Sequence, residues 1–248
     1  MQQSHYKDMG ELFSDLALED QQKNMEKVLY PKKYKFYATL LDAYQWYLNS
    51  EQDEAFQDFI NKINRVPFQS EAAEKGTAFN ELVDADKSLK GVTVEKETVK
   101  YKGFDFKRGL LNEFIGYFKS AIPQVFISSQ LETNKGLVEL YGYADKVLQD
   151  TCFDIKTTSK YEFPKFINNW QHKVYPYCFN CNGIFIDRFE YTVTDFNNIY
   201  KESYVWNPVK DLRGLMSICE SLIDFIELHR ELITDRKIFG LPKEEILT

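Results

Sequence analysis

Two acidic residues and a lysine are spaced so that they could share one face of a β-hairpin. Asp145 precedes an Asp-x-Lys triplet that starts at Asp154 and ends at Lys156. Asp150 and Thr151 lie between two runs rich in apolar residues, so we expect a two-residue turn there that joins antiparallel strands. In that register Lys156 lies opposite Asp145, and Asp154 is on the same face because side chains alternate with period two. Two carboxylates and an ammonium so placed could hold one Mg²⁺ or Mn²⁺ ion and orient a water for hydrolysis.

A structural explanation of the same three residues must be weighed against this chemistry. They could form a cross-strand ion pair on a solvated sheet face, worth about 0.2–1 kcal/mol, and taken alone they favour that interpretation. Gly142 and Ala144, which lie just before Asp145, argue against it. Small residues at these positions leave room for a ligand to approach the backbone.

Four segments resemble, in order, the motifs of the PD-(D/E)XK nuclease superfamily and of its RecB-like exonuclease branch. They are a G-T-x-x-H-E-like segment at 76–81, a G-x-x-D segment at 142–145, a D-x-K-T segment at 154–157 and a Q-x-x-x-Y segment at 171–175. D-x-K alone carries little information, whereas four motifs in this order are more specific. The resemblance implies a restriction-endonuclease-like fold.

The resemblance also implies roles for the hairpin residues. Asp145, Asp154 and the main-chain carbonyl of Ile155 would ligate the metal ion. Lys156 would orient or deprotonate the attacking water. Neighbouring carboxylates raise the pKa of a lysine, so we expect Lys156 to position the water rather than to act as a base.

The third metal ligand is expected from a helix over residues 71–87, where the family commonly has a histidine. This chain has Asn80 there, followed by Glu81. Successive residues of a helix point about 100° apart, so the two cannot both face one ion. We expect Glu81 to be the ligand, because a carboxylate binds a hard cation better than an amide does; Asn80 is the alternative.

A second helix, expected from about residue 164 to residue 181, carries Gln171 and Tyr175 one turn apart on one face. By the resemblance both line the site and contact the phosphate or the hydrated metal. Residues 36–64 are expected to form two further helices, which end before Pro67.

The composition limits the function classes. A net charge of −7 does not favour nucleic-acid binding, but four lysines near the hairpin form a local basic cluster that could contact phosphates. No long apolar run and no signal-peptide pattern occurs, so we expect a cytoplasmic protein without a membrane partner. The cluster consists of Lys156, Lys160, Lys165 and Lys173.

The four cysteines do not have the order of the iron–sulfur cluster that some RecB-like nucleases carry. Those relatives place one cysteine before the nuclease motifs and three after them, whereas here none precedes Gly76 and Cys152 lies in the hairpin. We therefore expect no iron–sulfur cluster and interpret the cysteines as buried free thiols.

The expected fold is α/β, with a central mixed sheet that contains an antiparallel meander and is flanked by helices. Residues 1–70 would form a helical region packed on a nuclease core at 71–248, as one compact unit. The expected function is a Mg²⁺- or Mn²⁺-dependent DNA exonuclease acting on ends or single strands, with a helicase or recombination protein as a further partner. The alternative is an inactive nuclease-fold module that binds DNA or a protein. A nucleotide-driven motor is disfavoured, because the chain has no phosphate-binding loop.

Overall fold

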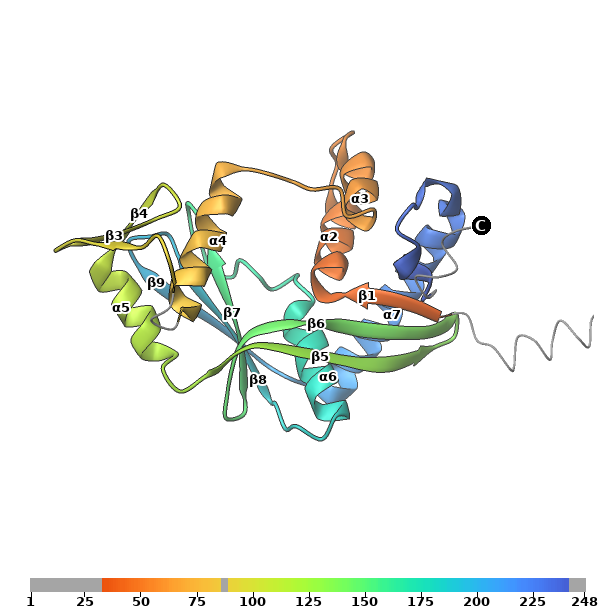
Figure 1. Ribbon diagram of the computed structural model, residues 1–248. Helices are drawn as coiled ribbons and strands as arrows, with labels where there is room; N and C mark the ends of the chain where they lie inside the picture. Colours follow the sequence, from red (N-terminus) through yellow and green to blue (C-terminus); the bar gives the residue numbers. More distant parts are fainter. Residues whose placement is uncertain (1–32, 86–88, 241–248) are drawn as a thin grey trace, which may run out of the picture.

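A six-stranded mixed sheet is the centre of the fold, with helices on both sides, in a computed structural model that describes residues 33–85 and 89–240 (Figure 1). This confirms the expected α/β class. The sheet order is β1-β6-β7-β8-β9, and β5 also pairs with β6. The strands are β1 (Lys33–Tyr37), β5 (Ile122–Thr133), β6 (Gly136–Leu148), β7 (Thr151–Thr157), β8 (Arg188–Thr194) and β9 (Ile199–Val205). Strand β1 runs parallel to β6 and β7 runs parallel to β8, while the other pairs are antiparallel.

The antiparallel meander expected from the sequence is formed by β5, β6 and β7, but its second turn differs. The turn residues are Gln149 and Asp150, and Gln149 has φ 55°. The last pair of the β6–β7 ladder is Lys146 with Phe153. If the same register is continued by one residue, the residue opposite Asp145 is Asp154 and not Lys156. The expected register was therefore wrong by two residues. A shift of two leaves every side chain on its original face.

Strand β6 changes partners along one of its edges. Its first half pairs with β1, up to the pair Tyr37–Tyr141, and its last residues pair with β7 from Lys146 onward. The other edge pairs with β5 along nearly its whole length. Residues 142–145 therefore lie in a fork, where β1 has ended and β7 has not yet joined. Figure 1 shows β7 diverging from β6 at this point.

The sequence prediction of two helices over 36–64 missed strand β1. Helix α2 (Ala38–Asn49) follows β1 directly, and α3 (Ala55–Ile63) follows α2. Residues 34 and 36 are buried, as a sheet strand with one covered face requires. The described part of the expected helical region therefore contributes a strand to the sheet, and residues 1–32 of that region lie outside the described residues.

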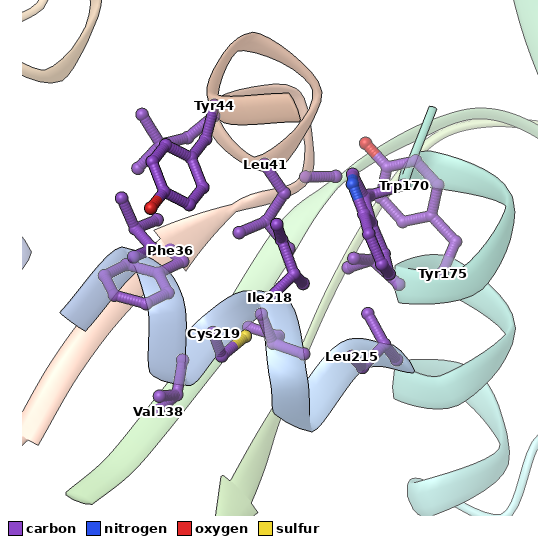
Figure 2. Packing of buried hydrophobic residues seen from close by; sticks show 14 of the residues in the cluster. Phe36, Leu41, Tyr44, Val138, Trp170, Tyr175, Leu215, Ile218 and Cys219 are labelled. Atoms are coloured by element: carbon purple, nitrogen blue, oxygen red, sulfur yellow. The ribbon is translucent and has the colours of Figure 1, made fainter. Parts of the chain in front are cut away.

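One hydrophobic core joins the sheet to α2, α6 (Gln171–Cys181) and α7 (Pro208–Leu228). In this core Leu41 of α2 lies between Tyr44, on the side of Phe36, and Trp170, on the side of α6 (Figure 2). Helix α7 ends before two short 3₁₀ turns, Arg230–Leu232 and Arg236–Phe239. Among the described residues, no helix has the length and apolar character needed to cross a membrane.

A second core lies on the other face of β7. It is formed by α4 (Glu71–Asp84), α5 (Arg108–Tyr117) and a small sheet of β2 (Thr93–Val94), β3 (Thr98–Tyr101) and β4 (Phe104–Lys107). Phe153 and Ile155 of β7 belong to this core, whereas Cys152 belongs to the first one. Because side chains alternate along a strand, Asp154 and Lys156 point with Cys152 toward the α6 side.

Gly142 is required by the close approach of α6 to the fork. A Cβ atom at this position would lie 2.7 Å from Cε1 and the hydroxyl of Tyr175. We predict that Gly142→Ala lowers the free energy of unfolding by about 1–3 kcal/mol through overpacking. Urea denaturation measures it. Gly116→Ala is the control, because nothing lies within 4 Å of a Cβ there; it should leave stability unchanged or slightly raised. Equal stability of the two variants would contradict this account of Gly142.

Candidate active site

The fork between β6 and β7 brings together the hairpin residues singled out by the sequence. Asp145 Oδ2 accepts a hydrogen bond from the backbone N–H of Ile155 at 2.8 Å. Lys156 Nζ lies 2.8 Å from Asp154 Oδ2. Asp154 is buried, while the side chain of Lys156 keeps 27% of its surface exposed. The three charged groups therefore sit at one place, with the ammonium on the side open to solvent.

The charges of this cluster perturb one another. Burial, and then the charge of Asp154, raises the pKa of Asp145 to about 7, although the Ile155 N–H and Lys156 act in the opposite direction. Burial alone would lower the pKa of Lys156, but Asp154, Asp145 and Asp42 outweigh it and raise that pKa above its usual value. Lys156 is thus held as an ammonium. The two carboxylates repel each other in a desolvated position, which is the electrostatic condition that a bound cation relieves.

Gln171 and Tyr175 contact the fork from α6. This helix begins at Gln171 rather than near residue 164, and the amide Nε2 of Gln171 donates to Asp154 Oδ1 at 2.7 Å. The Tyr175 hydroxyl donates to the Tyr143 carbonyl at 3.0 Å. Burial raises the pKa of Tyr175 well above its usual value, so the phenol stays protonated. Gln171 therefore orients a carboxylate, while Tyr175 packs against the strand that carries Asp145.

Helix α4 presents Asn80 to the other side of the fork. A Cβ at Gly76 would lie 2.6 Å from Thr157 Oγ1, and Asp84 pairs with Lys146, the partner of Phe153. From Gly76 to Asp84 the helix rises about 12 Å. This matches the roughly 13 Å between Thr157 and Phe153 along β7. Asn80 lies midway on the same face and is therefore level with Ile155. Its Oδ1 is buried and has no hydrogen-bond partner among the described residues.

Glu81 points away from this face of α4. Its carboxylate accepts from Lys102 Nζ at 2.7 Å, at the turn between β3 and β4, and this contact lowers its pKa. The structure therefore does not bring the expected third ligand together with Asp145 and Asp154. The physical reason is the 100° step between successive helical residues: with Gly76 and Asp84 against the strands, position 80 faces the fork and position 81 does not.

Asp84 and Lys146 form a partly buried ion pair that was not predicted from the sequence. Lys146 Nζ lies 2.5 Å from Asp84 Oδ1, and Gln124 Nε2 donates to Asp84 Oδ2 at 2.8 Å. Lys146 directly follows Asp145 in the chain, and the charge of Asp84 contributes to the raised pKa of Asp145. Spacing could have indicated Asp84, because it lies one turn after Asn80 on the same helix face.

The oxygen atoms at the fork suit a hard divalent cation. Two carboxylates are available, the Oε1 of Gln171 is buried without a described partner beside them, and the amide oxygen of Asn80 is likewise unpartnered on the α4 side of β7. Within 33–85 and 89–240, no group of three or more His, Cys, Asp and Glu side chains is placed to hold a metal ion. Such a donor set, with only two acids, fits an ion that keeps several of its waters, as Mg²⁺ does.

The lysines of the expected basic cluster all have local partners. Lys165 Nζ donates to Thr158 Oγ1 and to the Lys160 carbonyl, both at 2.6 Å. Lys160 pairs with Glu162, and Lys173 Nζ lies 4.0 Å from the centre of the Trp170 ring. The contacts of Lys160 and Lys165 lie on the surface, where such contacts are weak, whereas Lys173 is half-buried against the buried Trp170 ring. Lys160 and Lys165 can therefore exchange their partners for a phosphate.

A buried carboxylate anchors the loop between β7 and α6. Glu202 of β9 accepts hydrogen bonds from the backbone N–H groups of Lys165 and Phe166 at 3.0 and 2.9 Å. It also accepts from the hydroxyl of Tyr161 at 2.9 Å and from that of Tyr204. Donors of this number hold the carboxylate charged, with a lowered pKa despite its burial. The loop that connects Lys156 to Gln171 is thus fixed at its centre.

Known proteins resemble this chain only distantly. No family model matches the chain, and no curated protein sequence matches it. The crystal structure of SSO0001 is similar over 82% of this chain and 83% of its own, with 15% identity and a TM-score of 0.46. A "putative exonuclease" from Eubacterium rectale is similar over 82% of this chain and 81% of its own, with 14% identity and a TM-score of 0.45. Likenesses of this degree say nothing about activity.

The placement of Asn80 and Glu81 yields a prediction about metal binding. We expect Asn80→Ala to weaken Mn²⁺ binding about tenfold or more, as loss of a group at a metal site does, and Glu81→Gln to leave it within about twofold because Glu81 contacts Lys102. Calorimetric titration of Mn²⁺ into each variant measures both. If Glu81→Gln is the weaker binder, the helix face assigned to the fork is wrong.

Proposed function

We propose that this protein is a Mg²⁺- or Mn²⁺-dependent nuclease that hydrolyses the phosphodiester bonds of DNA. The observation that carries the proposal is the convergence of Asp145, Asp154 and Lys156 at the fork, with Gln171 bonded to Asp154. An ion pair on a solvated sheet face would not explain why two acids lie in a desolvated position with one pKa raised to about 7. It would not explain the unpartnered oxygens around them either.

Each residue at the fork has a distinct role in this proposal. Asp145 and Asp154 would hold the metal ion with the Ile155 carbonyl, and Asn80 of α4 would supply a further oxygen. When bound, the ion supplies an activated water and neutralises charge on the phosphate. Lys156, whose ammonium pairs with Asp154 at 2.8 Å, would orient the water or a phosphate oxygen.

The ammonium of Lys156 also has an electrostatic task. Hydrolysis builds negative charge on the phosphate, and a fixed cation beside it stabilises that charge. Gln171 keeps Asp154 oriented through its 2.7 Å hydrogen bond, so the carboxylate is placed before a substrate binds. The buried parts of the site are therefore preorganised.

One observation favours a second candidate, an inactive nuclease-fold module that binds DNA or a protein partner. In the part of the chain that the structure describes, a third acidic or histidine side chain does not join Asp145 and Asp154. A site with two acids binds its ion more weakly than one with three. Binding of DNA with no cleavage under any divalent cation would support this candidate.

The activity test uses linear DNA with Mg²⁺ or Mn²⁺. We predict that Asp154→Asn and Lys156→Ala each slow cleavage by at least about 100-fold, because each removes a charge at the reacting phosphate. Gel analysis of a labelled substrate measures the rates. Matched controls are Asp150→Asn, in the β6–β7 turn, and Lys135→Ala, in the exposed β5–β6 turn. Cleavage by either fork variant at near wild-type rate would place the chemistry elsewhere.

We further propose that the enzyme acts on DNA ends rather than at a recognised sequence. Sequence-specific cleavage needs side chains that read base edges in a groove, and the sequence contains no helix-turn-helix or zinc-finger pattern to present them. The lysines near the fork would contact phosphates, which carry no sequence information. A helicase or recombination protein remains a further proposed partner for duplex substrates.

Substrate topology tests this preference. A covalently closed plasmid should survive conditions that degrade its linearised form, and the linear form should shorten progressively with strong sensitivity to salt. Agarose gels over a time course follow both. Discrete fragments of reproducible length from the closed circle would instead show an endonuclease.

A further inference from the structure

The first turn of α6 receives its cap from a different helix. An α-helix leaves its first backbone N–H groups without partners inside the helix. The N-cap residue of α6, Trp170, makes no side-chain cap hydrogen bond. Asp42 of α2 instead accepts a hydrogen bond from the Trp170 N–H through Oδ1, and the N–H of Gln171 also reaches this carboxylate. A carboxylate at this helix end also complements the helix dipole.

Packing holds Asp42 in this position. Its neighbours Leu41 and Tyr44 are fully or almost fully buried in the core that joins α2 to α6 and α7 (Figure 2). Gln45, one turn away, accepts from the indole N–H of Trp170 at 3.3 Å. Two side chains of α2 therefore fix the residue that precedes Gln171.

The capped turn is the one that reaches the fork. Gln171 is the first residue of α6, and its amide donates to Asp154 Oδ1. A chain of hydrogen bonds thus runs from Asp42, through the start of α6, to Asp154. Burial raises the pKa of Asp42 to about 6, although the hydrogen bond from the Trp170 N–H lowers it. The charges of Lys156 and Asp154 also change this pKa, so Asp42 is within electrostatic range of the fork.

We propose that Asp42 is a positioning residue of the active site, which acts by capping α6 and thereby holding Gln171 against Asp154. This inference rests on the nuclease function proposed above. It adds to the four sequence motifs a residue of α2 that lies outside all of them.

The kinetic test compares Asp42→Ala with Asp42→Asn, which keeps an acceptor oxygen in the same place. Asp42→Ala should lower kcat about tenfold or more with little change in KM, and Asp42→Asn should stay within about threefold of wild type. The double variant Asp42→Ala/Gln171→Ala should be no slower than Gln171→Ala alone, because the two residues act in series. Asp58→Ala, an exposed acid on α3, is the control.

A second readout needs no catalysis. Amide hydrogen exchange at Trp170 and Gln171 should quicken by about tenfold in Asp42→Ala, as expected for one lost hydrogen bond, and stay unchanged in Asp42→Asn. This measurement holds even if the wild type cuts no DNA, so it separates failure of the cap from failure of the proposed function. If Asp42→Ala does not fold, Asp42→Gln, whose acceptor is displaced by one methylene, replaces it.

Three outcomes would overturn the proposal. They are unchanged exchange at both amides in Asp42→Ala, multiplicative losses of kcat in the double variant, and an Asp42→Asn variant as slow as Asp42→Ala. The last would assign the effect to the charge of Asp42 rather than to its cap.

Discussion

The site depends on one edge of β6 being shared by two strands. Strand β1 uses the first part of this edge and β7 the last, so no strand of the described residues lies beside 142–145 there. The backbone N–H of Ile155 would otherwise be a buried donor without a partner, and the carboxylate of Asp145 accepts it. If β7 paired with β6 for its whole length, main-chain hydrogen bonds would fill the space where the carboxylates now meet.

The two hydrophobic cores place a helix on each side of this fork. Phe153 and Ile155 anchor β7 to the core of α4, while Cys152 anchors it to the core of α6. Alternation along a single strand therefore decides that Asp154 and Lys156 face α6, and close packing at Gly76 and Gly142 brings both helices near enough to contact the fork. Close packing of apolar side chains in the two cores thus fixes the positions of the polar residues at the fork.

Structural features that depend on residues close in the sequence could be predicted from it, whereas contacts between residues far apart in the sequence could not. The meander and the face of Asp154 were predicted correctly, because alternation is local and the register error was an even number of residues. Strand β1 was missed because α2 follows it without a break. Glu81 was ranked above Asn80 on ligand chemistry alone, and the structure pairs Glu81 with Lys102 instead, because contacts with β7, which the sequence does not show, orient the helix. Asp42 lies 128 residues from Trp170, and no spacing rule connects them.

The anchoring of the β7–α6 loop by Glu202 has a consequence for how related chains can vary in length. A loop held only at its ends can lengthen at small cost in free energy. This one is also held at its middle, by backbone donors at Lys165 and Phe166 that reach a strand at the far edge of the sheet. An insertion on either side of that anchor would displace Lys156 or Gln171 relative to it. The β5–β6 turn is tied only to α7, through Asn134 and Glu220 and through Lys135 and Asp224, and not to the fork. Length differences among relatives should therefore accumulate at the hairpin tip and be rare between residues 158 and 170.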